Sequence, residues 1–169
     1  MRKREARLER AAEKRLKQEE KSARLRDTPV DGKKPRTGAN PDSIFHQQMS
    51  WTCENADHDG VWSWGTARKW EDAHWDEAVK PKLGQWEKLT WAEIDSIASG
   101  SGHKMHHTMD VDVITDEAQL RLMELDKIEA SIFRFRLGNK PRLWGFRRVA
   151  EFHVLWYDPD HKIYPVEPE

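Results

Sequence analysis

The chain has 169 residues, of which 35% are charged and 37% are hydrophobic. This length allows one compact domain plus a tail. The apolar fraction is low beside the roughly 45–50% usual in globular proteins, so part of the chain is predicted to lie outside the core. The net charge of −1 hides an asymmetry: residues 1–38 carry 14 Lys/Arg and 7 Asp/Glu, and the remainder carries 15 and 23. A basic arm on an acidic body predicts a phosphate-bearing or acidic partner for the arm.

Composition excludes several classes of protein. Nine Trp argue against overall disorder. The single cysteine, Cys53, excludes an intrachain disulfide framework and a multi-cysteine zinc site, and it fits a reducing compartment. No apolar run approaches the roughly 18–20 residues that span a bilayer, and no apolar segment of a secretory signal follows the basic N-terminus. We therefore expect a cytoplasmic protein without a membrane partner.

The N-terminal quarter of the chain differs from the rest. Residues 1–27 are strong helix formers without Gly or Pro, and their apolar stripe is thin, which predicts a basic, solvent-exposed helical arm. The alternatives are an arm that contacts nucleic acid or the ribosome, and a helix that binds a protein partner. Residues 28–42 hold three Pro and two Gly and are predicted to be a flexible linker. A single α+β domain is predicted over residues 43–169.

The first part of this domain, residues 66–128, is predicted to be helical. Helical spacing that begins at Trp70 predicts a helix that Pro81 ends. Thr90, with a glutamate three residues on, is a capping box and predicts the start of a second helix. Thr115 precedes a third amphipathic segment as its expected N-cap.

The hydrophobic period then changes from 3.6 to 2. Over residues 131–166 this change predicts an antiparallel meander of three or four strands, separated by turn-forming segments such as 138–141 and 158–161. A short last strand is expected from residue 162. Helices followed by a C-terminal antiparallel sheet give the fold class α+β. Alternation predicts one buried face of the sheet, made by Phe133, Phe135, Phe152, Val154 and Trp156.

The opposite, polar face of this sheet is the first candidate site. Residues 131–150 contain six basic residues and no acidic one. Alternation places Arg134 and Arg136 together, and either Arg142 or Arg147 joins them. An arginine can hold a phosphate through two parallel N–H groups. The alternative is a solvated face whose arginines pair with carboxylates of the acidic body.

His153 and Tyr157 are expected across from these arginines. His can move a proton near neutral pH, and an aromatic side chain can hold an RNA base. This combination predicts metal-independent RNA cleavage. The predicted catalytic residues are His153, Tyr157 and Arg147, and the predicted nucleic-acid-binding residues are Arg134, Arg136, Arg142, His103, His106 and His107.

The segment "HKMHHTMDVD" is the second candidate site, in a loop or at the start of a strand. His103, His106 and His107 are residue types that a metal accepts, but their spacing matches none of the helical zinc motifs. The alternatives are a polar loop and a loop whose histidines contact RNA or act in catalysis. We expect no metal and no cofactor.

Tryptophans and the cysteine are assigned structural roles. The Trp residues between positions 51 and 91 are typical of a core, with base-stacking platforms as the alternative. Cys53 has no His at an informative spacing and is predicted to be a structural or exposed thiol.

The segments "EAQLRL", "FRFRL", "RLWGF" and "FHVLWYDPDHKIYP" carry a resemblance. Over roughly residues 103–166 the chain resembles a group of uncharacterised bacterial and phage proteins, which implies no activity. In the order of its elements it is also similar to the RelE/ParE toxin superfamily, whose members are small basic α+β ribonucleases or gyrase poisons paired with an antitoxin. The acidic body, the longer chain and the absence of a basic last strand depart from that superfamily, so its catalytic residues are not carried over.

Two functional hypotheses follow from these observations. The first is a RelE-like toxin-type ribonuclease whose partners are RNA and an antitoxin or the ribosome. The alternative is a non-enzymatic module that binds nucleic acid or protein, with a role in phage biology or defence. The position of His153 separates the two, because a general base must lie on the arginine face.

Overall fold

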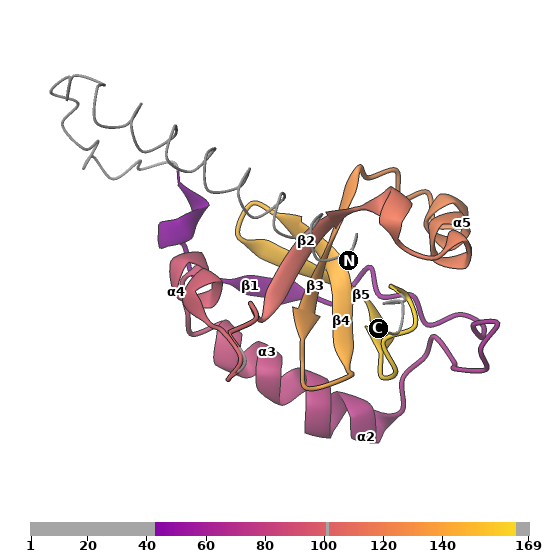
Figure 1. The fold of residues 1–169 in the computed structure, drawn as a ribbon, viewed down its shortest axis with the longest axis horizontal. Coiled ribbons are helices and arrows are strands. Elements are labelled where there is room, and N and C mark those ends of the chain that lie inside the picture. The colour runs from indigo at the N-terminus through magenta and orange to yellow at the C-terminus, as the bar shows by residue number, and fades with distance from the viewer. Residues whose placement is uncertain (1–42, 101, 165–169) are drawn as a thin grey trace, which may run out of the picture. The chain divides into compact units, whose positions relative to one another are not determined.

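The computed structural model describes residues 43–100 and 102–164, which form a five-stranded sheet with helices on both faces (Figure 1). The strand order is β1-β5-β4-β3-β2. β1 runs parallel to β5, and every other neighbouring pair is antiparallel. The strands are β1 (Ser50–Thr52), β2 (His106–Asp110), β3 (Ser131–Arg136), β4 (Arg142–Arg148) and β5 (Glu151–Asp158).

This arrangement confirms the predicted α+β class with a C-terminal strand meander. The meander has three strands, β3 to β5, and the predicted last strand does not form at residues 162–164. The histidine segment, which had been predicted as a loop or a strand start, begins in a loop at His103 and continues into the edge strand β2. The predicted arm (1–27) and linker (28–42) lie outside the described residues.

Seven short helical segments connect and cover these strands in the described part of the chain. None of them is long and apolar enough to cross a membrane. They are η1 (Ile44–His46), α2 (Asp72–His74), the π-helical η2 (Trp75–Val79), α3 (Lys80–Trp86), α4 (Trp91–Ser96), η3 (Val111–Val113) and α5 (Asp116–Glu124).

Pro81 does not end the helix that was predicted to begin near Trp70. Segments α2, η2 and α3 follow one another without a break, and Pro81 lies in the first turn of α3. Just before it, the Lys80 N–H donates to the Trp75 carbonyl five residues back. Proline lacks an N–H and its ring collides with the carbonyl four residues back. A π turn shifts the hydrogen-bond pattern by one residue at this point, so the helix continues.

The predicted N-caps behave differently from one another. Thr90 and Glu93 form the complete capping box at the start of α4. Thr115 is the N-cap residue of α5, but its side chain makes no capping hydrogen bond. On α5, Leu122 is buried, whereas Leu120 is 60% exposed.

Both faces of the sheet are buried. We call the face covered by η2, α3 and α4 the helix face, and the face covered by α5 and the segment 57–68 the α5 face (Figure 1). The strand residues of the helix face are Phe133, Phe135, Leu143, Phe152, Val154 and Tyr157. Those of the α5 face are Ile132, Trp144, Phe146, Leu155 and Trp156.

Trp156 therefore lies on the face opposite to the one predicted. Gly145 pairs with Val154 and the residue before it pairs with Trp156, so Leu155 is an extra residue in β5. Such a bulge reverses the alternation beyond it. Gly145 is required here, because a Cβ atom would collide with the carbonyl oxygen of His153.

Candidate functional site

Three arginines gather on the α5 face near the hairpin that joins β3 and β4. Arg136 pairs directly with Arg142 across the two strands, and Arg134 lies two residues before Arg136 on the same face. We call Arg134, Arg136 and Arg142 the arginine cluster. Of the two residues left open by the sequence, Arg142 rather than Arg147 joins the cluster.

The arginine cluster is largely buried and lacks an ion-pair partner. Arg134 is 8% exposed and Arg142 is 5% exposed, while Arg136 is half-buried. None of the three lies within 4.0 Å of a carboxylate among residues 43–100 and 102–164. The Nε atoms of Arg134 and Arg142 are buried and have no hydrogen-bond partner in the described part of the chain. Positive charge is thus concentrated here without direct compensation, in a body that is acidic overall.

Asp158 is the carboxylate whose charge acts on two of these arginines, and it favours their charged forms. Its oxygens are already occupied. They accept hydrogen bonds from the backbone N–H groups of Lys162 and Ile163, at 2.9 and 3.0 Å, and from Trp144 Nε1 at 3.4 Å. Asp158 therefore fixes the C-terminal turn and does not neutralise the cluster by direct pairing.

Arg134 is held by aromatic and histidine side chains. Its Nη1 donates to Nε2 of His161 at 2.7 Å. The guanidinium carbon lies 5.4 Å from the Trp144 ring centroid and 5.1 Å from that of Tyr164. Burial, together with the positive charges of the arginine cluster, lowers the pKa of His161 to about 4. His161 is therefore neutral at physiological pH and accepts the hydrogen bond from Arg134.

Arg142 supports the β3–β4 hairpin. Its Nη1 lies 3.0–3.2 Å from the backbone carbonyl oxygens of residues 138–141. Burial and the charges of Arg136 and Arg134 lower the pKa of Arg142 to about 10. The side chain remains charged at neutral pH, and its position is fixed by the loop.

The three predicted loop histidines separate in the structure. His107 pairs with Arg134 across β2 and β3, and burial and the Arg134 charge lower its pKa. His106 points to the helix face, where it stacks on Phe133 with ring centroids 5.4 Å apart. His103 lies in the preceding loop. Only His107 is thus beside the arginine cluster, and the described residues contain no group of three or more potential metal ligands.

The three predicted catalytic residues are not gathered at the arginine cluster. Tyr157 lies on the helix face, where burial raises its pKa. Arg147 also lies there, 5.1 Å above the Trp91 ring. His153 is on the α5 face but outside the cluster. Its Nε2 lies 2.9 Å from the Glu151 carboxylate, and its Nδ1 is hydrogen-bonded to the side chain of Asn55. The catalytic roles of these residues stay predictions.

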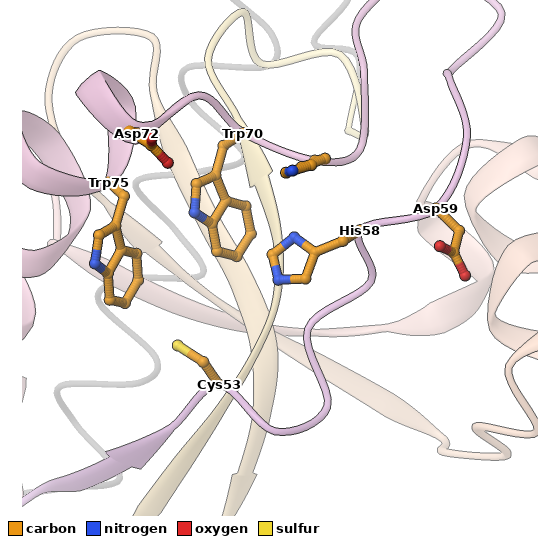
Figure 2. A pocket seen from close by; sticks show the side chains of 7 residues that line it. Cys53, His58, Asp59, Trp70, Asp72 and Trp75 are labelled. Atoms are coloured by element: carbon orange, nitrogen blue, oxygen red, sulfur yellow. The ribbon is translucent and has the colours of Figure 1, made fainter.

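Cys53 lines a pocket beside two tryptophans (Figure 2). It is half-buried, and burial raises the pKa of its thiol to about 11. The thiolate is the nucleophilic form of cysteine. Cys53 is therefore a protonated, weakly reactive thiol at neutral pH, in line with a structural role.

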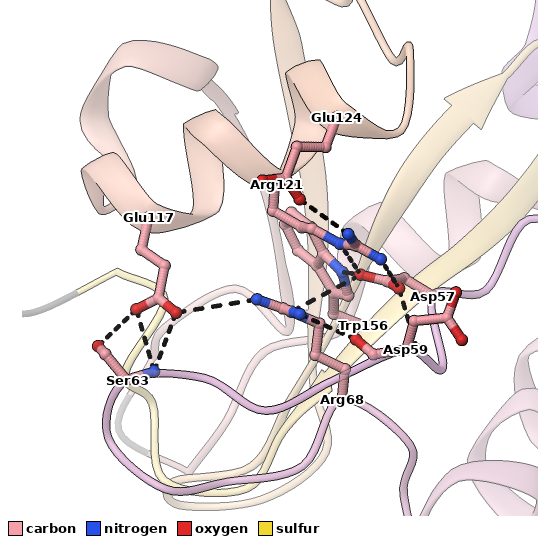
Figure 3. Close-up of polar contacts among 8 residues, drawn as sticks. All are labelled: Asp57, Asp59, Ser63, Arg68, Glu117, Arg121, Glu124 and Trp156. Carbon is pink, nitrogen blue, oxygen red and sulfur yellow. Dashed lines mark hydrogen bonds and ion pairs between the residues drawn. The ribbon is translucent and has the colours of Figure 1, made fainter.

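A second charged group on the α5 face is compensated, in contrast to the arginine cluster (Figure 3). The side chain of Asp57 is 1% exposed and accepts two hydrogen bonds from Arg121, at 2.7 and 2.8 Å, and one from Trp156 Nε1 at 2.9 Å. Arg68 lies 3.8 Å away. Burial alone would raise the pKa of Asp57, but the hydrogen bonds from Arg121 and Trp156 outweigh it and lower that pKa. This group ties the segment 57–68 and α5 to the sheet.

His161 and Tyr164 contribute to the arginine cluster but were absent from the sequence-based candidates. The segment "DPDHKIYP" was interpreted as a turn and a strand. The turn instead brings His161 back to Arg134, 27 residues earlier in the chain. The available signal was the chemistry of this segment, a histidine and a tyrosine directly after the last strand.

Comparisons with protein families, with curated proteins and with solved structures found no match for this chain. The resemblance to RelE/ParE toxins therefore stays a prediction from the order of elements.

Proposed function

We propose that the protein is a nucleic-acid-binding module that holds phosphate groups with the arginine cluster. One observation carries this proposal: three adjacent guanidinium groups, two of them almost fully buried, have no carboxylate partner in the described chain. Buried charges in proteins are normally paired. An unpaired cluster of one sign in an acidic body is suited to a ligand of the opposite sign.

Phosphate fits the chemistry of the cluster. A guanidinium carries its donors in a fixed fork, which matches phosphate oxygens two at a time. The Nε atoms of Arg134 and Arg142 are buried, so these two arginines act on a phosphate mainly through their charge. An anion there would also reduce the repulsion among the three positive charges. Arg136 is half-buried and His107 is exposed, so these two side chains offer the approach from solvent.

Binding is better supported than cleavage. His161 is hydrogen-bonded to the cluster, but its Nε2 is engaged by Arg134 and its pKa of about 4 makes it a weak base at neutral pH. His153 lies elsewhere on the sheet. Ribonuclease activity, and with it an antitoxin or the ribosome as partner, stays a prediction. We also propose a cytoplasmic location, on the basis of the single cysteine.

The test compares two arginines of the same full-length chain. Arg136→Gln removes the solvent-facing charge of the cluster, and Arg148→Gln removes an exposed charge that pairs with Glu129 at the other end of β4. Binding of labelled single-stranded RNA and DNA is followed by fluorescence anisotropy between about 50 and 200 mM salt. We expect Arg136→Gln to weaken binding and to lower the slope of log K against log salt by about 0.7, the value for one phosphate contact on a single strand.

Arg148→Gln should leave both affinity and slope near wild type. Both variants keep the basic N-terminal residues, so any difference between them reports the cluster. Equal effects of the two variants would contradict the proposal. The same RNA incubated with the protein, with and without EDTA, tests cleavage: products that disappear with His153→Gln would favour the ribonuclease instead.

A further inference from the structure

A pocket separate from the arginine cluster lies where β1 meets the segment before α2. Its volume is about 580 Å³, within the range of small-molecule sites. Figure 2 shows Trp70 between Trp75 and His58, with the Cys53 thiol below them. The pocket is thus built by side chains from three parts of the chain.

The aromatic rings of this pocket are held in place by one another. The Trp70 and Trp75 rings are stacked, with centroids 5.9 Å apart and an interplanar angle of 13°. The His58 ring meets Trp70 edge to face at 4.7 Å. Trp51 packs against Trp75 from the side, at 5.9 Å, and its Nε1 donates to Glu87. Trp70 and Trp75 remain partly exposed, so part of each ring is accessible to a ligand.

The charged residues around these rings are mainly acidic. Asp59 and Asp72 line the pocket and form no ion pair with any residue of the described chain. Lys69 is the lining ammonium group, and it is exposed. The raised pKa of Cys53 keeps that thiol uncharged. The lining therefore combines aromatic rings with an excess of negative charge.

We propose that this pocket binds an alkylated ammonium group. The faces of aromatic rings carry partial negative charge and attract cations, most strongly for Trp, and rings of this kind recognise quaternary ammonium ligands. The two unpaired carboxylates add favourable charge. They also disfavour phosphate-bearing ligands, so this site is distinct from the proposed nucleic-acid site. Two sources share the chemistry: a free compound such as choline, and a trimethyllysine side chain of a protein.

Isothermal titration calorimetry on the full chain tests the proposal with matched ligands. Choline is compared with the neutral alcohol in which a carbon atom replaces its nitrogen, so that shape is kept and charge is lost. We expect choline to bind about fivefold to thirtyfold more tightly, because the contribution of the cation is on the order of 1–2 kcal/mol. Equal affinity for the two compounds, or no binding of either choline or trimethyllysine peptide up to about 10 mM, would overturn the proposal.

Three variants locate the site. Asp72→Asn removes an exposed, unpaired charge without disturbing the core and should weaken choline about threefold to tenfold. Trp70→Leu should weaken it further, with its thermal midpoint measured alongside. Trp64→Leu is the control, because Trp64 stacks on Trp62 outside the pocket and should leave binding unchanged. If Asp72→Asn and Trp64→Leu bind choline equally, the site is not this pocket.

Further ligands distinguish a protein partner from a free ammonium compound, and an ammonium ligand from a nucleoside. A trimethyllysine peptide that binds more tightly than choline, while the unmethylated peptide does not bind, identifies a protein partner. Choline binding more tightly than the peptide identifies a free compound. Uridine or adenosine binding that is lost in Trp70→Leu, without choline binding, would replace the proposal with a base-stacking pocket.

Discussion

The α5 face of the sheet carries two charged groups that the fold treats in opposite ways. Around Asp57, every buried charge has a partner: Arg121 binds the carboxylate through two hydrogen bonds, and Trp156 supplies a third (Figure 3). In the arginine cluster, Arg134 has a neutral histidine and aromatic rings as neighbours, and no carboxylate of residues 43–100 and 102–164 lies within 4.0 Å of it.

This difference in charge pairing indicates that the two groups have different roles, one in folding and one in ligand binding. A buried ion pair with satisfied hydrogen bonds fixes how segments pack, although it adds little net stability. A buried charge without a partner costs free energy in the isolated protein. We infer that the Asp57 group serves the fold, whereas the arginine cluster serves a ligand that brings the missing negative charge.

Breaking the compensated group should have the largest effect. Asp57→Asn leaves Arg121 without its buried counter-charge, and we expect the free energy of unfolding to fall by about 3–5 kcal/mol. Urea denaturation measures this loss. Asp59→Asn, an exposed residue two positions away, is the control and should change stability by less than about 0.5 kcal/mol. Similar losses in both variants would show that the Asp57 group is not structural.

Low pH should reduce the free energy of unfolding through His161, the histidine bound to the arginine cluster. The pKa of His161 is about 4 in the folded protein, below the roughly 6.5 of an unfolded chain. The unfolded state therefore takes up the proton first, and stability is lost as pH falls from about 6.5 towards 4. His161→Gln should show a flatter dependence of the free energy of unfolding on pH over this range. The lowered pKa values of His106 and His107 leave some slope in the variant. An unchanged slope would contradict the assignment.

Removing an uncompensated charge should matter far less than removing a compensated one. Arg134→Met leaves no carboxylate unpaired, and methionine suits the space beside Trp144, so we expect stability within about 1 kcal/mol of wild type. Nucleic-acid affinity should nevertheless fall. Arg121→Met, the same substitution at the other group, removes two hydrogen bonds from the buried Asp57 carboxylate and leaves it only the more distant Arg68 as a counter-charge, so it should cost about 3–5 kcal/mol. Comparable losses of stability in the two variants would contradict the distinction between the arginine cluster and the Asp57 group.

The smallest effect should come from the rim of the compensated group. Glu124 pairs with Arg121 Nη1 at 2.8 Å but is 63% exposed, so the pair is weak in water. We expect Glu124→Gln to change the free energy of unfolding by less than about 0.5 kcal/mol, measured by urea denaturation at low and high salt. A loss of several kcal/mol would place Glu124 inside the structural group.

Local patterns predicted the fold well where neighbouring residues alone decide it. The capping box at Thr90 and the three strands of the meander are set by residues a few positions apart. The same holds for Arg134 and Arg136, which share a face because they are two residues apart in one strand. The prediction that Pro81 ends its helix was wrong, because the π turn that accommodates the proline has no clear signature in the sequence.

The composition of the site depended on pairing between distant strands. Whether Arg142 or Arg147 joins Arg134 is decided by the register of β4 against β3. The bulge at Gly145 moves Trp156 to the α5 face, so Tyr157 faces away from the cluster. The contact of His161 with Arg134 forms only when the turn after β5 closes.

Three features could be read from the amino-acid sequence alone: the α+β class, the helix start at Thr90 and the arginine-rich, acid-free character of residues 131–150. These features depend on short-range periodicity, on the order of the predicted elements and on residue chemistry, none of which requires knowledge of the folded arrangement. The pairing of charges depends on the folded arrangement, because an ion pair joins residues from separate parts of the chain. Asp57 and Arg121 are 64 positions apart and meet as an ion pair, whereas Arg136 of β3 meets Arg142 of β4, a residue of the same charge.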